Sequence, residues 1–293
     1  MISAADDGFH PPAESDIWWT ETAWFGFAVP ERRIAGALYP LFRPNLGVCA
    51  ASVHVWDDRA EAPWAVLYAR TFWHLPLPQR LQSMELECGL SYECVEPLRS
   101  YRLRYADGDA LALDLTFDAL IAPHSVGAGS GRGHFDQPGR VQGLLRLRGE
   151  ELRVDCLEMR DRSWGPRSDA VGLRGGYDYG TVSARDGFHT LSIFAGDREQ
   201  IVGGYLLRDG ELADVVSGTR EVVARERGHP QRVRVVATDQ LGRKLEAEGE
   251  CVNRLAFQAS PGLFAWMSLT HWRFGDHAAW GEDQEVWPSR PGP

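Results

Sequence analysis

Hydrophobic and polar residues alternate along most of the chain, a pattern typical of β-strands with one buried face. In residues 101–117, tyrosine and leucine alternate with arginine, and apolar residues return with the same period after the Asp107-Gly108 turn. Similar patterns predict hairpins over 140–156, 177–194, 202–216 and 232–250, and single strands over 50–56, 64–73 and 262–273. Residues 76–89 could hold a short helix. The pattern therefore predicts an all-β fold.

The least periodic segment is residues 122–140, which is rich in Gly, Ser and Pro. We place a domain boundary there, because 293 residues suffice for two ordinary domains. The expected domains are residues 1–135 and 136–293. Antiparallel strands in such numbers are expected to close on themselves, since closure removes exposed sheet edges. The sequence thus predicts two antiparallel β-barrels, or strongly curved sheets, packed together.

Charge and composition narrow the choice of partners. The chain has 41 acidic against 31 basic side chains and a net charge of -10, which repels nucleic acid and anionic membrane surfaces. Its first residues lack the features of a secretory signal, and no run approaches about 18 apolar residues, so we expect a cytoplasmic protein without membrane insertion. The five cysteines lack metal-binding spacing and are interpreted as buried thiols. A homodimer is compatible with the sequence.

The motif RDRSWGPR, residues 160–167, combines three arginines, an acid and a tryptophan at the end of a predicted strand. It has two interpretations. Asp161 could accept a bidentate bond from an arginine while Trp164 stacks on another, which would make the motif a structural lock. Alternatively, Asp161 faces an apolar cavity that raises its pKa, so that it holds and delivers a proton. The sequence leaves both open.

Two other segments combine acids and histidines. His134 and Asp136 alternate on an extended segment and so point the same way, either as an acid–base pair or as the cap of a surface turn. Residues 270–287 contain His271, Glu282 and three tryptophans, which either line an aromatic pocket or pack the last strand. Each segment therefore has either a catalytic or binding role or a purely structural one.

Near the start of the chain, Trp24 and Glu21 lie in one aromatic segment, where a carboxylate needs solvent or a partner such as Arg43. No HExxH-like spacing supports a metal site, and no GxGxxG or P-loop motif supports a nucleotide, so we expect no metal and no cofactor. Without a GxSxG motif, Ser163 is a poor candidate for a hydrolase nucleophile.

RDRSWGPR, together with HFDQPGRVQG at residues 134–143 and WGEDQEVW at residues 280–287, resembles a bacterial family related to the carotenoid 1,2-hydratase (hydroxyneurosporene synthase) and AttH group. WWTETAWFGF and VEPLRSYRLRY in the first half are similar to that family as well. The resemblance implies two lipocalin-like β-barrels. It also implies a hydratase, cyclase or isomerase for terpenoid-, steroid- or polyketide-like substrates.

The resemblance further implies a reaction in which a carboxylic acid protonates an alkene or polarises an oxygen while aromatic rings stabilise the cation. Asp161 would be the proton donor and Arg162 would orient it. Asp136, His134 and Glu282 are the alternative acid–base groups. The residues expected to contact the substrate are Trp164, Tyr177, His271, Trp272, Trp24 and Glu21.

We therefore expect a cofactor-independent lyase or isomerase that acts on a hydrophobic small molecule. The alternative is a non-catalytic protein that binds a hydrophobic ligand, as lipocalin-like barrels often do. A deep apolar cavity without a buried carboxylate would favour the alternative. An acid desolvated against aromatic rings would favour catalysis.

Overall fold

The computed structural model describes residues 2–12, 16–126, 132–167, 174–260 and 262–288. The chain forms two compact units. Unit 1 comprises Met1–Val29, Gly36–Val55 and Leu67–Ser168, and unit 2 comprises Pro30–Ala35, Trp56–Val66 and Asp169–Pro293. The last change of unit falls between Ser168 and Asp169 instead of at the expected position between 135 and 136. The reason is that strand β10 (Gly133–Leu147) runs through that position and pairs with neighbours on both sides.

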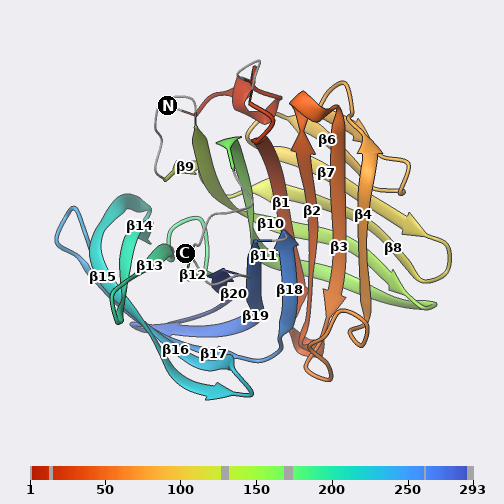
Figure 1. Cartoon of the computed structure of the whole chain (residues 1–293). Coiled ribbons are helices and arrows are strands. Elements are labelled where there is room, and N and C mark those ends of the chain that lie inside the picture. Colours follow the sequence, from red (N-terminus) through yellow and green to blue (C-terminus); the bar gives the residue numbers. More distant parts are fainter. Residues whose placement is uncertain (1, 13–15, 127–131, 168–173, 261, 289–293) are drawn as a thin grey trace. The chain divides into compact units, whose positions relative to one another are not determined.

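Unit 1 is built on one antiparallel sheet that curls into a half-barrel. Its strands lie in the order β4-β3-β2-β1-β11-β10-β8-β7-β6-β5, and β9 pairs with β10 (Figure 1). Two short 3-10 helices, η1 (Ala4–Asp7) and η3 (Pro44–Leu46), accompany the sheet. Its strands are β1 (Trp19–Val29), β2 (Ile34–Arg43), β3 (Val48–Trp56), β4 (Tyr68–Pro76), β5 (Ser83–Glu85), β6 (Ser91–Glu96), β7 (Ser100–Asp107), β8 (Leu111–Ala119), β9 (His124–Ser125), β10 (Gly133–Leu147) and β11 (Glu150–Pro166).

Unit 2 contains a closed barrel of eight strands. The strand order is β17-β16-β15-β14-β13-β12-β20-β19-β18, and an additional pairing of β17 with β19 closes the barrel. The unit also contains the 3-10 helix η2 (Pro30–Arg32). Its strands are β12 (Gly175–Thr181), β13 (Gly187–Ala195), β14 (Arg198–Arg208), β15 (Glu211–Glu226), β16 (His229–Asp239), β17 (Lys244–Cys251), β18 (Leu255–Ser260), β19 (Leu263–Phe274) and β20 (His277–Pro288).

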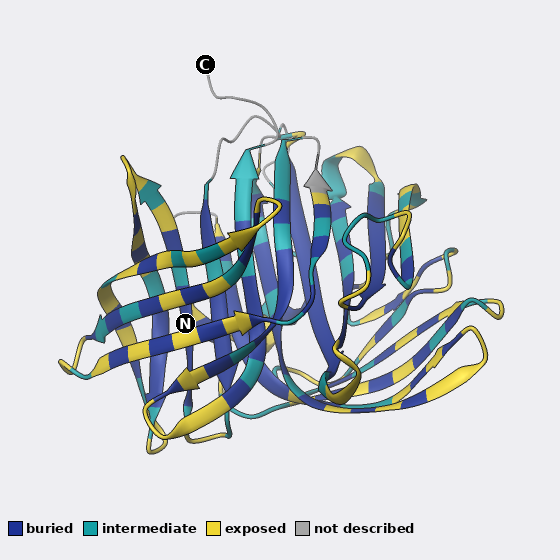
Figure 2. Ribbon diagram, turned by 90° about the horizontal axis from the view of Figure 1, so that it is seen from below, coloured by how far each residue is buried: buried dark blue, intermediate teal, exposed yellow. Residues whose placement is uncertain are grey.

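The alternation of side chains explains why these segments form strands. Exposed and buried residues follow each other strictly along β17, and Figure 2 shows similar bands on other strands. Tight turns use residues at positive φ, Arg148-Gly149 between β10 and β11 and Asp209-Gly210 between β14 and β15. The predicted hairpins are all present, and the all-β prediction is confirmed.

Residues 76–89 do not form the short helix that the sequence allowed. They contain turns and the strand β5, with Leu81, Met84 and Leu86 buried. The spacing of these apolar residues does not follow a helical period, so burial on one face requires an extended chain. No helix in the described part of the chain is long and apolar enough to cross a membrane.

Each unit has its own core. In unit 1, the ring of Phe25 contacts those of Tyr101 and Phe117 at centroid distances of 5.7 and 5.6 Å. In the barrel, Phe188 packs edge-on against Trp272 at 5.2 Å, surrounded by buried aliphatic side chains. Much of the heavy aromatic content of the chain is therefore packing, as expected for side chains that bury large areas.

Candidate active site

Strand β11 places successive residues of RDRSWGPR on opposite faces of the first sheet. Arg160, Arg162 and Trp164 point to one face, which we call the arginine face, and Asp161 and Ser163 point to the other, which we call the acid face. The strand ends at the Gly-Pro pair, as the sequence predicts. Because β1 and β10 flank β11, their residues in register with Asp161 share the acid face.

On the arginine face, Arg160 is fully buried and attaches the N-terminal segment to the sheet. Its guanidinium donates hydrogen bonds of 2.9 Å to both Asp7 and Gln137, and lies 4.0 Å from the ring centroid of Tyr101. Asp7 also accepts hydrogen bonds from the Tyr101 hydroxyl and the Leu98 backbone N–H. A buried ion pair needs such additional hydrogen bonds to offset the loss of hydration.

Arg162 has a similar anchoring role. It donates hydrogen bonds to Glu21 at 2.8 Å and to the carbonyl oxygens of Gly8 and Thr22 at 2.7 Å. Glu21 also accepts a hydrogen bond from the backbone N–H of His10, and together these contacts keep its pKa low in spite of burial. Glu21 therefore belongs to the anchor of the N-terminal segment.

Trp164 completes this anchor. Its ring stacks on His10 with centroids 3.8 Å apart, and a Cβ added at Gly133 would lie 2.0 Å from the Trp164 ring. The expected partner of Glu21, Arg43, instead donates to the carbonyl oxygens of Trp18 and Arg167. The arginine face of the motif is thus a structural lock.

On the acid face, residues that the sequence singled out lie together. Asp161 is opposite Asp136 on β10 and opposite Trp24 on β1. His134 Nε2 lies 2.9 Å from Oδ2 of the fully buried Asp136. None of the described side chains forms a hydrogen bond or an ion pair with the Asp161 carboxyl. We call His134, Asp136 and Asp161 the acid cluster.

A chain of hydroxyl groups and one arginine lies beside the acid cluster. The hydroxyl oxygens of Thr22 and Ser163 are 2.7 Å apart, and Arg167 donates a hydrogen bond of 2.7 Å to the Ser163 hydroxyl. Tyr39 on β2 forms hydrogen bonds with Thr22 and Arg167, and its ring meets that of Trp24 at a centroid distance of 5.3 Å. We call Thr22, Tyr39, Ser163 and Arg167 the hydroxyl chain.

The electrostatics of the acid cluster raise the pKa of Asp161 towards neutral pH. Burial raises the pKa of Asp161 to about 6, assisted by the negative charge of Asp136 and opposed by the positive charges of His134 and Arg167. Burial alone would lower the pKa of His134, but the charge and hydrogen bond of Asp136 raise it to about 9. Near neutral pH the cluster therefore holds an imidazolium paired with a carboxylate, beside an acid that is partly protonated.

Tyr39 stays neutral over the same range of pH. Its burial raises the pKa of its hydroxyl, an effect that the charge of Arg167 only partly offsets. The acid face thus offers a proton donor, a cation and a neutral hydroxyl next to two aromatic rings. This combination can transfer a proton and bind an oxygen atom.

Two further predicted residues, on β19 of unit 2, do not join a polar cluster of this kind. Trp272 is fully buried in the apolar core of the barrel. His271 contacts the ring of Trp280 at a centroid distance of 4.9 Å. Among the described residues, no group of three or more His, Cys, Asp or Glu side chains could hold a metal ion.

Tyr177 and Glu282 lie in a second aromatic group of the barrel. Tyr177 contacts the rings of His189 and Tyr179 at centroid distances of 4.6 and 5.8 Å. Glu282 accepts hydrogen bonds from the Tyr179 hydroxyl at 3.2 Å and from the Gln284 amide at 3.0 Å. Glu282 is thus bonded within this aromatic group, whereas none of the described side chains is bonded to the Asp161 carboxyl.

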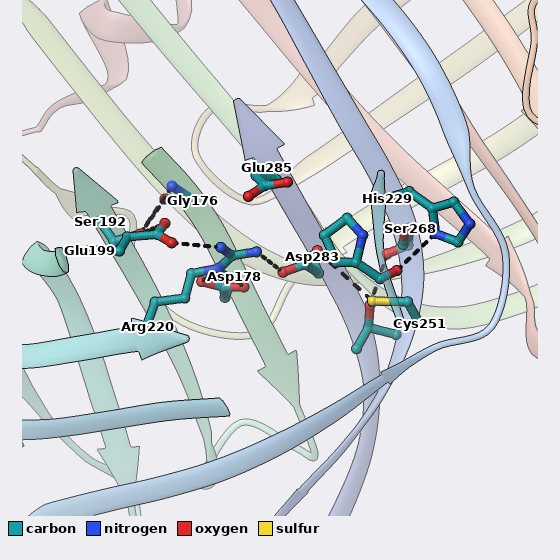
Figure 3. Close-up of polar contacts among 12 residues, drawn as sticks. Gly176, Asp178, Ser192, Glu199, Arg220, His229, Cys251, Ser268, Asp283 and Glu285 are labelled. Carbon is teal, nitrogen blue, oxygen red and sulfur yellow. Dashed lines mark hydrogen bonds and ion pairs between the residues drawn. The ribbon is translucent and has the colours of Figure 1, made fainter. Parts of the chain in front are cut away.

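The barrel interior also contains a charged cluster, drawn in Figure 3. Arg220 is almost fully buried and donates hydrogen bonds to Asp178, Glu199 and Asp283. Burial raises the pKa of Asp178 well above its ordinary value. A Cβ added at Gly176 would lie 2.5 Å from Cδ of Arg220, so the arginine side chain occupies the space that this glycine leaves. These charges have partners within the cluster, and Arg220 fills part of the barrel interior.

Sequence reasoning missed most of the hydroxyl chain. Ser163 and Arg167 stand in RDRSWGPR, and the period of the strand already puts Ser163 on the side of Asp161. That signal was available. The sequence carries no comparable signal for Tyr39, because its place beside Trp24 depends on how β2 and β1 lie together in the folded sheet.

The comparison with known families shows to which family the chain belongs. A family model described as domain of unknown function (DUF7064) matches residues 3–283, so the chain belongs to this family. No curated protein matches the chain in sequence.

Solved structures share the fold at low sequence identity. An AttH-like protein from Nitrosomonas europaea is 15% identical with a TM-score of 0.63, and the match covers 91% of each chain. Kievitone hydratase from Nectria haematococca is 11% identical with a TM-score of 0.60, covering 98% of this chain and 93% of that one. CghA, solved with Sch210972, is 10% identical with a TM-score of 0.59, covering 93% and 89%. Likeness at this level concerns the fold alone.

Proposed function

We propose that this member of the DUF7064 family is a cofactor-independent acid–base enzyme that acts on a hydrophobic small molecule. The observation that carries the proposal is Asp161, a largely buried carboxyl to which none of the described arginines is bonded and whose pKa is raised to about 6. An acid with a pKa near the working pH is an efficient proton donor, because it is both available and able to recover its proton.

Each residue of the acid face has a role in this proposal. Asp161 delivers a proton to the substrate and regains one at the end of the cycle. His134, held as an imidazolium by Asp136, stabilises the Asp161 carboxylate in between. The rings of Trp24 and Tyr39 provide apolar contact area. The reaction is a hydration, a cyclisation or an isomerisation.

The comparisons support the class of reaction only through the fold. One protein with this fold is named as a hydratase, and another was solved with the compound Sch210972. The resemblance of RDRSWGPR to the carotenoid 1,2-hydratase group adds terpenoid-, steroid- and polyketide-like substrates to the proposal. Because one fold can host many activities, the acid cluster carries the argument.

The test is turnover by an Asp161→Asn variant on a panel of terpenoid, steroid and aromatic alkenes and enones. We expect a loss of about 100-fold or more, the usual effect of removing a general acid. Asp155→Asn is the matched control, because Asp155 lies on the same strand but is paired with Arg140 on an exposed surface. Full activity in Asp161→Asn would remove Asp161 from its role. Tight binding of panel compounds without turnover by the natural chain would favour a binding protein.

A further inference from the structure

We propose that the substrate carries an oxygen function conjugated with its reacting double bond, and that Arg167 and Tyr39 bind this oxygen. The inference rests on the proposed function and names the substrate class as a conjugated carbonyl compound, such as an enone, in place of an isolated alkene. Its basis is the hydroxyl chain beside the acid cluster, where hydrogen-bond donors lie next to the proton donor.

Within the part of the chain that the structure describes, Arg167 has donors to spare for such an oxygen. Its guanidinium carries five N–H donors, of which one is given to Ser163, and it also bonds with Tyr39. The residue is exposed, so the remaining donors are accessible to a ligand. Ser163 is in turn bonded to Thr22, which fixes the position of the arginine relative to the sheet. A carbonyl oxygen or an enolate is the natural acceptor for these groups.

The balance of charge on the acid face also favours an anion. His134 and Arg167 each carry a positive charge and Asp136 carries a negative one, so a protonated Asp161 leaves an excess of one positive charge. The charge of Arg162 acts on Asp161 as well, but Arg162 is itself paired with Glu21 on the arginine face. The other side chains in register on this face are Thr22, Trp24, Ser163 and, on β9 opposite Asp136, His124, while Tyr39 lies beside Trp24 and burial keeps its hydroxyl neutral. Such a site repels a carbocation and stabilises an oxyanion.

Hydration of an enone follows from these positions without any redox change. The oxygen of a water molecule bonds to the β-carbon, and the electron pair of the double bond moves onto the carbonyl oxygen held by Arg167 and Tyr39. The α-carbon then takes the proton of Asp161 while the carbonyl re-forms. The added water loses one proton to the Asp161 carboxylate, which restores the acid and leaves a β-hydroxy ketone.

The experiment compares the binding of two probes of equal shape, 2-acetylnaphthalene and 2-isopropenylnaphthalene, which differ in an oxygen against a methylene group. We expect the natural chain to bind the ketone about tenfold more tightly, the difference that one hydrogen bond from a charged donor typically makes. Arg167→Met and Tyr39→Phe should each remove most of this preference and leave the affinity for the alkene unchanged. Arg140→Met is the matched control, since Arg140 is an exposed arginine paired with Asp155.

Equal affinity for the two probes, or a preference that persists in Arg167→Met, overturns the inference. The readout does not depend on turnover, because the preference should also persist in Asp161→Asn. If the natural chain turns over panel compounds normally but shows no preference between the probes, the oxygen site alone is contradicted. Full turnover by Asp161→Asn with an intact preference would contradict the proposed acid alone.

Discussion

Asp161 differs from Asp7 and Glu21, the acids paired with arginines of β11, because no cationic side chain of the described residues is bonded to it. Asp7 is paired with Arg160 and Glu21 with Arg162, so that both acids belong to the anchor of the N-terminal segment. Burial is the main influence on the pKa of Asp161, and burial favours the neutral acid. One residue of the motif is thus available for proton transfer while its neighbours on either side are not.

Activity should depend on pH through this residue. With Asp161 as the proposed acid, kcat/KM should fall as the pH rises through about 6, where the proton is lost. The measurement is a pH profile on any panel compound that is turned over. A profile that is flat between pH 5 and pH 8, two values chosen on either side of about 6, would contradict proton donation by Asp161.

His134→Gln should move this profile to higher pH. The positive charge of His134 lowers the pKa of Asp161, so its removal allows the pKa to rise above about 6. The midpoint of kcat/KM against pH gives the shift. His277→Gln is a suitable control, because His277 is exposed and belongs to unit 2. A midpoint that moves to lower pH, or does not move, would contradict the assigned charge.

Asp161→Asn should stabilise the folded chain at neutral and higher pH. The pKa of Asp161 is raised from 3.8 to about 6 in the folded state. Ionisation of the buried carboxyl therefore lowers the free energy of unfolding as the pH rises between these two values, and the full penalty applies above about 6. An amide has no such penalty, and we expect a gain of about 1 to 3 kcal/mol at pH 8 and little change below pH 4. Urea denaturation at the two values measures it. Equal effects at both would contradict the raised pKa.

Individual residues were predictable from the sequence to different degrees. The period of the strand placed His134 and Asp136 together, and the chemistry of RDRSWGPR pointed to Asp161. The partners of its arginines were not predictable, because Asp7 and Glu21 lie about 140 to 150 positions away and reach them only through the folded sheet. Tyr39 was missed for the same reason.

At the scale of elements, short-range signals were sufficient for the hairpins and insufficient for the boundary between units. Turn residues such as Asp209-Gly210 specify a strand pair locally. The loop-like composition of residues 122–140 suggested a break, but part of that segment is β10, whose pairing with β8 and β11 holds it in the first sheet. Residues 127–131 lie outside the described residues. Composition does not reveal pairing between distant strands.

The stability of the barrel should depend on Arg220. Arg220→Met leaves Asp178, Glu199 and Asp283 buried without their cation, and we expect a loss of about 3 to 5 kcal/mol in the free energy of unfolding. Chemical denaturation is the measurement. The matched control is Arg234→Met, which removes an exposed ion pair with Glu246 and should cost about 1 kcal/mol or less. Equal losses in the two variants would show that the charged cluster contributes no more than a surface pair.

At the scale of the whole molecule, the chain contributes to unit 2 from three separate stretches. Within that unit, Asn253 accepts a hydrogen bond from the Trp56 indole at 3.0 Å and donates one to the Arg33 carbonyl at 2.8 Å, while Arg254 is bonded to Glu61 at 2.7 Å. The first two stretches therefore supply partners for buried polar groups of the third. No single cut in the chain separates the two units.

A fragment of residues 169–293 should consequently be less stable than the same residues in the full chain. It lacks Trp56, so the buried amide of Asn253 loses a partner, and unmet hydrogen bonds of this kind cost about 1 to 3 kcal/mol each. Thermal unfolding followed by near-ultraviolet circular dichroism is the measurement. Asn253→Ala in the full chain should reproduce part of the loss. A fragment that unfolds at the temperature of the full chain would contradict this dependence.

The two faces of β11 have a practical consequence for protein engineering. Because Arg160 and Arg162 alternate with Asp161 and Ser163, the anchor and the proposed site occupy one strand without sharing a side chain. Libraries that vary Trp24, Tyr39 and Ser163 can therefore change substrate preference while every contact of the N-terminal segment is kept. Libraries that vary Arg160, Arg162 or Trp164 would lose folded protein first, because these side chains hold the N-terminal segment.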